Sequence, residues 1–143
     1  MKSKKVLIMG LPGSGKTTLT KNIVKKLNAE WLNADKIRGK YNDWDFSKSG
    51  IIRQVKRMRL LSKKSKKKIV VADFICPHHE QIKIFQPNFI VWMDTIKKSR
   101  YPRMNRIFEK PKKYDLRVKE KNYKLWSKIV IYKIKSKFNY KLG

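Results

Sequence analysis

The sequence has little cysteine, few acidic residues and no long apolar run. Cys76 is the single cysteine, so no disulfide can form within the chain, and a reducing compartment suits it. No apolar stretch approaches the roughly 20 residues that a membrane-spanning helix needs. A strand expected at residues 4–9 leaves no room before it for a signal peptide. We therefore expect a cytoplasmic protein with no membrane partner and a single domain over residues 1–143, a length that can bury a sizeable core.

The scarcity of acid leaves a large positive charge, because 38 basic residues face 10 acidic ones and the net charge is +28. Such a charge attracts anionic ligands and makes nucleic acid a candidate partner. Lysines outnumber arginines 30 to 8, however, and base recognition and paired phosphate contacts favour arginine. The lysines are also spread along the chain, which fits a compositional bias toward lysine at solvent positions. Both interpretations stay open, and nothing in the pattern specifies an oligomeric state.

The segment from Gly10 to Thr17, GLPGSGKT, matches the phosphate-binding pattern G-x-x-x-x-G-K-[ST]. An apolar run precedes it and a helical apolar pattern follows it, so a strand leads through a glycine-rich turn into a helix. The backbone N–H groups of such a turn and the helix dipole favour phosphate. Lys16 can reach the β- and γ-phosphates of ATP, and the Thr17 hydroxyl can bind Mg²⁺. The expected nucleotide-binding residues are Gly10, Pro12, Gly13, Ser14, Gly15, Lys16, Thr17 and Thr18.

The rest of the chain alternates between predicted strands and helices. Strands are expected at 4–9, 30–34, 69–75, 89–93 and 116–118, and helices at 15–27, 49–62, 79–85 and 123–138. Residues 97–111 carry several arginines without a clean apolar face, and we expect them to form a mobile lid. This alternation predicts an α/β protein with a parallel five-stranded sheet flanked by helices. Taken with the phosphate-binding turn and the resemblance given below, the expected fold is the P-loop kinase fold with a lid. Ligands of such a fold bind at the carboxyl ends of the strands.

Two aspartates fall at predicted strand ends. Asp35 could accept the proton of a substrate hydroxyl or hold Mg²⁺, and it could equally cap a short helix over residues 36–38. Asp73 lies within an apolar strand, where a carboxylate is costly to bury unless it is paired. It resembles the acid that holds Mg²⁺ in P-loop proteins, and a structural hydrogen-bond acceptor is the alternative. Asp94 is expected to cap a turn with Thr95.

Other chemistry-bearing residues give weaker patterns. His78 and His79 beside Cys76 lack the spacing of a zinc site, so an exposed loop is expected there. Arg38 could clamp an anionic substrate, and Arg103 and Arg106 could bring positive charge from the lid to the transferred phosphate. The aromatic side chains Trp44, Phe46 and Phe74 could stack on a base or belong to the core.

Five segments, in order, resemble the adenylylsulfate kinase family. They are the P-loop, LNADKIR at 32–38, DFS at 45–47, FICP at 74–77 and VWMDT at 91–95. The resemblance covers roughly residues 6–95 and implies transfer of the ATP γ-phosphate to the 3′-hydroxyl of adenylylsulfate, with Mg²⁺. It assigns the base-like role to Asp35 and substrate binding to Arg38, and it places Phe46, Phe74 and Ile75 around the substrate adenine.

The chain departs from the family at two places. Where the family has a substrate-binding Arg and Asn, an ungapped alignment places Ile51 and Gln54, and Arg53 or Arg57 could substitute from the same helix. The lid motif of the family is absent, and a segment with Arg103 and Arg106 stands in its place.

Three hypotheses follow: a kinase that acts on adenylylsulfate, a P-loop kinase that acts on a hydroxyl of nucleic acid or of a modified base in it, and a nucleotide-binding module without catalysis. The third is disfavoured by the lid arginines together with Asp35 and Asp73.

Overall fold

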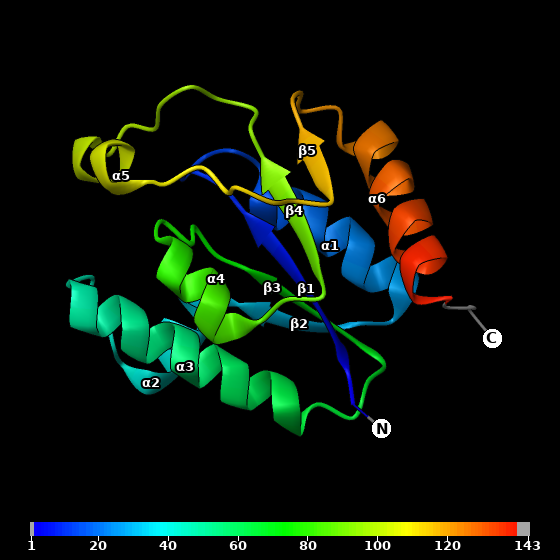
Figure 1. Ribbon diagram of the computed structural model, residues 1–143, viewed down its shortest axis with the longest axis horizontal. Coiled ribbons are helices and arrows are strands. Elements are labelled where there is room, and N and C mark those ends of the chain that lie inside the picture. Colours follow the sequence, from blue (N-terminus) through cyan, green and yellow to red (C-terminus); the bar gives the residue numbers. More distant parts are fainter. Residues whose placement is uncertain (1, 140–143) are drawn as a thin grey trace.

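A computed structural model describes residues 2–139 and contains a five-stranded parallel sheet. Its strands are β1 (Lys4–Met9), β2 (Glu30–Asn33), β3 (Ile69–Asp73), β4 (Phe89–Met93) and β5 (Leu116–Val118), in the order β2-β3-β1-β4-β5. Every neighbouring pair is parallel, so all five carboxyl ends meet at one edge of the sheet. The expected fold class is confirmed (Figure 1), and all five expected strands are present, although β2 ends at Asn33 and not at 34, and β3 ends at Asp73 and not at 75.

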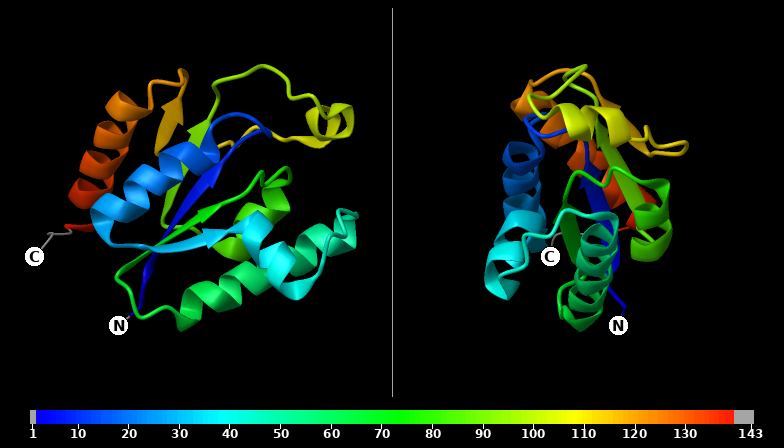
Figure 2. Two further views of the ribbon diagram at one scale, coloured as in Figure 1. Left: turned by 180° about the vertical axis from the view of Figure 1, so that it is seen from behind. Right: turned by 90° about the vertical axis from the view of Figure 1, so that its left-hand side faces the viewer.

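Helices cover both faces of the sheet (Figure 2). One face packs against α1 (Lys16–Leu27) and α6 (Tyr123–Phe138), and the other against α2 (Ala34–Tyr41), α3 (Lys48–Lys64) and α4 (His79–Phe85). Because side chains alternate along a strand, Val71 lies in the first core and Val70 in the second. No helix within residues 2–139 has the length and apolar character needed to cross a bilayer.

The boundaries correct one interpretation of Asp35. Strand β2 ends at Asn33, whose side chain caps α2 by accepting the backbone N–H of Lys36. Asp35 is therefore not the cap; it lies in the first turn of the helix, with its carboxylate exposed. Asparagine and aspartate cap helices about equally well. Asn33 is the cap, and Asp35 is not, because the strand ends at Asn33.

The lid region contains a short helix, α5 (Pro102–Ile107), joined to β4 by a long loop that arcs over the carboxyl edge in Figure 1. Met104 is the buried residue of α5. Ser47 caps α3 by accepting the N–H of Gly50 at 3.2 Å.

The loop before α3 lies directly on Gly50. A Cβ at this position would overlap the backbone carbonyl oxygen of Asp45, so no larger residue fits without moving the loop. Gly39 in α2 provides a contrast, because the atom nearest to its added Cβ would be Cζ2 of Trp44 at 3.7 Å, an ordinary contact.

We predict opposite effects of alanine at these two helical glycines. Gly50→Ala should lower the free energy of unfolding by about 1–3 kcal/mol, because the clash with Asp45 outweighs the helix propensity of alanine. Gly39→Ala should raise it by about 0.5–1 kcal/mol, because the propensity gain is not offset. Urea unfolding of both variants measures the difference, and equal effects would contradict the close approach at Gly50.

Candidate functional site

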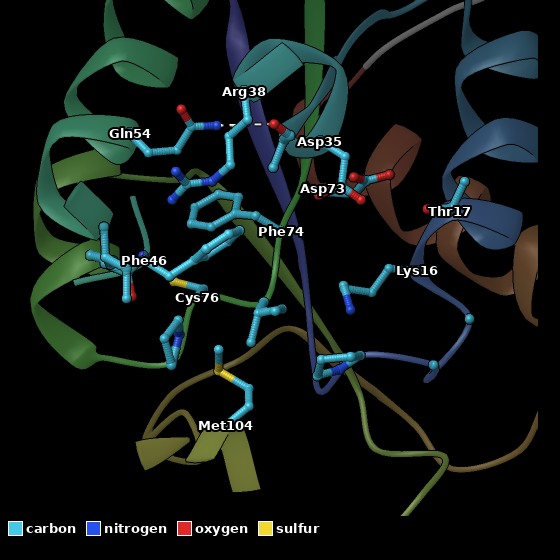
Figure 3. Close-up of a pocket in the computed structure, with 18 of the residues that line it drawn as sticks. Lys16, Thr17, Asp35, Arg38, Phe46, Gln54, Asp73, Phe74, Cys76 and Met104 are labelled. Carbon is cyan, nitrogen blue, oxygen red and sulfur yellow. Dashed lines mark hydrogen bonds between the residues drawn. The ribbon is translucent and has the colours of Figure 1, made fainter. Parts of the chain in front are cut away.

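A cavity of about 470 Å³ opens at the carboxyl edge of the sheet. Its walls come from the loop after β1, the start of α2, the first turns of α3, the segment after β3, α5 and the start of α6 (Figure 3). Of the expected nucleotide-binding residues, Pro12, Gly13, Gly15, Lys16, Thr17 and Thr18 line it. Gly10 and Ser14 are buried.

The glycines of the P-loop are required by its shape. Gly13 and Gly15 have φ of 82° and 99°, which side chains rarely adopt. At Gly10 a Cβ would come within 2.6 Å of the carbonyl oxygen of Met93, so the loop can pass close to β4 only with glycine there. Ser14 Oγ is buried without a hydrogen-bond partner among the described residues. These features fit a backbone that curls to hold phosphate.

Three residues from outside the P-loop fix it in place. Thr95 Oγ1 donates to the carbonyl oxygen of Ser14 at 2.6 Å, and Lys121 Nζ donates to that of Gly13 at 3.0 Å. The carbonyl of Ser14 and the N–H of Gly15 belong to one trans peptide and point in opposite directions. The hydrogen bond from Thr95 to that carbonyl therefore directs the N–H of Gly15 away from Thr95. The Tyr123 hydroxyl lies against Gly15, where a Cβ would overlap it.

The sequence pattern did not identify these three anchors. Their signal was the position of Thr95 directly after β4 and of Lys121 and Tyr123 after β5, at the edge that also holds the P-loop. Asp94, which we expected to cap a turn with Thr95, instead accepts from Arg117 Nε at 2.8 Å.

Lys16 faces two carboxylates across the cavity. Its Nζ donates to the carbonyl oxygens of Gly10 and Leu11 at 2.9 Å each. Burial lowers the pKa of Lys16 to about 8, and the negative charges of Asp73 and Asp35 act in the opposite direction. Figure 3 shows both aspartates between the aromatic half of the cavity and the P-loop, with their carboxylates on the side of Thr17. The site can therefore balance positive and negative charge before any ligand enters.

Asp73 is held in place by strand β2. Its carboxylate accepts from Trp31 Nε1 at 3.0 Å and from Asn33 Nδ2 at 3.1 Å. Burial raises the pKa of Asp73, while these donors and Lys16 lower it. The residue is thus a structural hydrogen-bond acceptor whose carboxylate also lines the cavity, and Trp31 and Asn33 are two further residues that sequence reasoning missed.

The donor set of the cavity fits Mg²⁺. No group of three or more His, Cys, Asp or Glu residues within 2–139 forms a complete metal cage. Mg²⁺ commonly binds through one or two carboxylates together with substrate phosphates and water, and Thr17, Asp35 and Asp73 supply oxygen ligands beside the P-loop. His78 and His79 do not line the cavity; they lie half-buried at the start of α4, where we expected an exposed loop.

The other half of the cavity is aromatic, with one arginine. Phe46, Phe74 and Ile75 line it, and Phe74 packs edge-on against Phe85, with ring centroids 5.8 Å apart. The Arg38 guanidinium lies 4.2 Å from the centroid of the Phe46 ring. Arg38 is 4% exposed, and burial lowers its pKa. This half therefore offers flat apolar surface together with a single buried positive charge.

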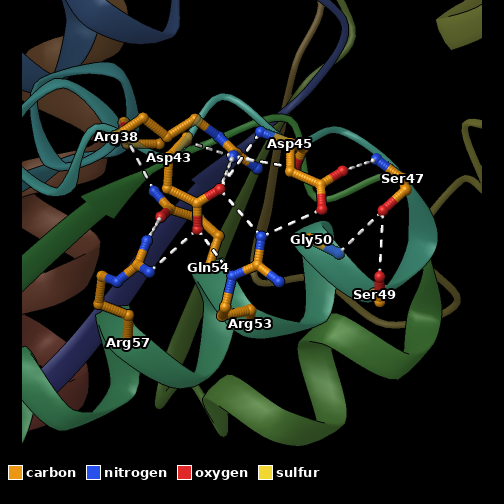
Figure 4. A network of polar contacts seen from close by, with 10 residues as sticks. Arg38, Asp43, Asp45, Ser47, Ser49, Gly50, Arg53, Gln54 and Arg57 are labelled. Atoms are coloured by element: carbon orange, nitrogen blue, oxygen red, sulfur yellow. Dashed lines mark hydrogen bonds and ion pairs between the residues drawn. The ribbon is translucent and has the colours of Figure 1, made fainter.

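The loop before α3 is fixed by a network of arginines and aspartates (Figure 4). Arg38 Nη1 donates to the backbone carbonyl oxygens of Asp43 and Asp45, at 2.9 and 3.1 Å. The Asp43 carboxylate accepts from Arg53 Nε at 2.8 Å and from Arg57 Nη2 at 3.0 Å. These hydrogen bonds hold the pKa of Asp43 well below its usual range.

The network places Arg53 outside the cavity. Its side chain is 47% exposed and is engaged by Asp43 and Asp45, which explains why it does not line the site that we expected it to serve. Ile51 and Gln54 do line the cavity. Gln54 Nε2 donates to the carbonyl oxygen of Ala34 at 3.1 Å, so it fastens α3 to the start of α2.

The lid arginines also lie outside the cavity lining. Arg103 Nη2 donates to the carbonyl oxygen of Phe46 at 3.0 Å, which links α5 to the loop before α3. Arg106 is exposed. Met104, between them in sequence, is the α5 residue that reaches the cavity.

Solved structures with the same fold span nearly the whole chain. The APS kinase CysC of Mycobacterium tuberculosis, in complex with AMPPNP and APS, superposes with a TM-score of 0.79 at 22% identity over 94% of this chain and 98% of that one. A shikimate kinase from Acinetobacter baumannii gives 0.64 at 16% over 94% of each chain. A gluconokinase from Sinorhizobium meliloti 1021 gives 0.66 at 11% over 93% and 92%. All three share the P-loop kinase fold.

A search of curated proteins finds no match. A family profile does match: AAA_33, described as an AAA domain, covers residues 6–82. That span runs from the P-loop strand through the aspartates and aromatic residues of the cavity into α4, and it is more than half of the chain. The protein therefore belongs to the AAA_33 family, within which it has a P-loop kinase fold.

Proposed function

We propose that the protein is an ATP-dependent kinase that phosphorylates the 3′-hydroxyl of adenylylsulfate. One observation carries this proposal: a single cavity joins the P-loop and its Lys16 to the wall formed by Arg38, Phe46 and Phe74, with Asp35 and Asp73 between them. A phosphate donor at one end and a flat anionic acceptor at the other would meet at the carboxylates. The similarity to a kinase solved with AMPPNP and APS supports this assignment of the two ends.

The donor end binds the phosphates of ATP through the P-loop N–H groups and Lys16. The ammonium group of Lys16 opposes the negative charge of the β- and γ-phosphates, and this attraction strengthens as charge develops in transfer. Bound Mg²⁺, held by Thr17 with Asp35 or Asp73, would supply further positive charge to the phosphates. Trp31 and Asn33 keep the Asp73 carboxylate in place for this contact.

The acceptor end binds the substrate and removes its proton. Arg38 offers N–H donors to an acid group, while Phe46, Phe74 and Ile75 cover the adenine. The hydroxyl oxygen attacks the γ-phosphorus, the bond to the leaving ADP breaks, and Asp35 takes the proton. Arg103 and Arg106 would reach the transferred phosphate through movement of α5 toward the P-loop.

A hydroxyl of nucleic acid is the second candidate acceptor, favoured by the net charge of +28. Salt distinguishes the two, because contacts to several phosphates release counterions and binding then weakens steeply as salt rises. A labelled-ATP transfer assay that offers adenylylsulfate, nucleosides and DNA side by side tests the proposal. Transfer to DNA alone would replace the first candidate with the second, and transfer to none would support a module without catalysis.

We predict that nucleotide affinity depends on the protonation of Lys16. The free protein has a Lys16 pKa of about 8, and bound phosphate raises it, so binding is strongest below pH 8 and weakens as pH rises through that value. Calorimetric titration with ADP between about pH 7 and 9.5 measures this trend. Lys16→Met should bind ADP weakly and show no dependence of affinity on pH in this range. An ADP affinity of the wild type that does not change with pH would contradict a contact between Lys16 and the phosphates.

Asp35→Asn should separate catalysis from binding. The amide cannot take the substrate proton, so turnover should fall by roughly 10²-fold or more while ADP affinity changes little. Asn33 remains as the cap of α2, so the melting temperature should stay near that of the wild type. Glu80→Gln, which removes an exposed carboxylate that does not line the cavity, is the control, and unchanged turnover in Asp35→Asn would contradict the catalytic role.

Arg38→Lys should raise the KM for adenylylsulfate by about tenfold or more with little change in the KM for ATP, because lysine loses the paired donors and the stacked plane. Arg57→Lys is the matched control, since Arg57 also fastens Asp43 but does not line the cavity. Steady-state kinetics of both variants decide the matter. Equal effects would assign Arg38 to holding the loop alone.

A further inference from the structure

Exposed aromatic side chains gather on the connection between α2 and α3. Tyr41 is 46% exposed, Trp44 53% and Phe46 41%. The chain's four tryptophans all lie in the described residues, and Trp44 is the one that is exposed. Three exposed lysines, Lys40, Lys48 and Lys56, lie on the two helices that this connection joins. We call these six residues the Trp44 surface.

The backbone beneath the Trp44 surface is held in one conformation. Two arginines bind the carboxylate of Asp43, Arg38 binds the carbonyl oxygens on either side of Trp44, and Gly50 allows the loop to lie directly on α3 (Figure 4). The indole also lies against α2, because its Cζ2 would be 3.7 Å from a Cβ added to Gly39. A large apolar side chain is therefore held by a fixed loop with 53% of it exposed to solvent.

The charges around this indole favour an anionic partner. The two carboxylates of the loop, Asp43 and Asp45, are both engaged by arginine. The Trp44 surface therefore presents aromatic rings and lysine ammonium groups, and the Asp45 carboxylate beside it, on a side chain that is 43% exposed, is paired with Arg53. Two of the rings are already backed by cations, since Arg57 lies 4.4 Å from the ring centroid of Tyr41 and Arg38 lies 4.2 Å from that of Phe46.

We propose that the Trp44 surface binds single-stranded nucleic acid, with a base stacked on Trp44 and the backbone phosphates met by the lysines. Bases of a single strand expose flat faces that stack on aromatic side chains, and positive charge nearby follows the phosphates. A duplex hides those faces, so it would gain only the charge contacts. This inference goes beyond the proposed kinase activity and does not depend on it, although Phe46 belongs to both the surface and the cavity.

The test uses a fluorescently labelled oligothymidylate of about 12 nucleotides, a length that one stacking surface can engage. Anisotropy without ATP gives its affinity for the wild type, Trp44→Ala, Trp44→Phe and Tyr132→Ala. Tyr132 is the matched control because it is 69% exposed and lies among the lysines of α6. An abasic strand of the same length and charge separates stacking from charge, and an anionic vesicle is added as competitor.

Trp44→Ala should weaken binding by about tenfold, the abasic strand should lose a similar factor on the wild type, and Trp44→Phe should retain most of the affinity. Tyr132→Ala should bind as the wild type does. Equal binding of wild type and Trp44→Ala, equal binding of the abasic strand, or displacement by vesicles would each overturn the proposal. The binding assay contains no ATP, so its outcome does not depend on whether the protein phosphorylates adenylylsulfate. Failure to bind the oligonucleotide would likewise leave the adenylylsulfate proposal unaffected.

Discussion

Lys16 is half-buried and Asp73 is buried at the same edge of the sheet, and burial disfavours the charged form of each. It lowers the pKa of Lys16 and raises that of Asp73, while the attraction between the two works against both shifts. Neither charge is stable in this position without the other or without hydrogen-bond partners, which are acceptors for Lys16 and donors for Asp73. Trp31 and Asn33 supply donors to Asp73, and the carbonyl groups of Gly10 and Leu11 accept from Lys16. The first residues of α1 and the last of β2 and β3 are thereby constrained together.

Only the parts of this site that a local stretch of sequence determines could be predicted from the sequence. The P-loop is contiguous, so its residues and the helix that follows could be predicted directly, and the alternation of strands and helices gave the parallel sheet. The carboxylates Asp35 and Asp73 were predicted because they follow apolar runs. Trp31 was not predicted, since its role depends on the pairing of β2 with β3, which brings together residues 42 positions apart.

The contacts that fix the P-loop were also not predicted, because the residues that make them are far from it in the sequence. Lys121 and Thr95 reach the P-loop from 108 and 81 residues away, and only the strand order brings them near it. For Asp35, a local pattern offered two interpretations, and the end of β2 at Asn33 excluded the cap. Arg53 was assigned to the substrate from its position on α3, but the acids that bind it precede the helix and could not be weighed without coordinates.

The arrangement of α3 has a further consequence for the acceptor end of the cavity. Arg53 and Arg57 form ion pairs with Asp43 and Asp45, so they fix the loop and contribute no charge to the cavity. Arg38 is then the one arginine among the described lining residues, and its Nη1 is shared with the loop carbonyl groups. The acceptor end therefore relies on aromatic surface more than on charge. The same fixed loop that limits the charge in the cavity presents Trp44 on the outside, so one network of arginines and aspartates shapes both surfaces.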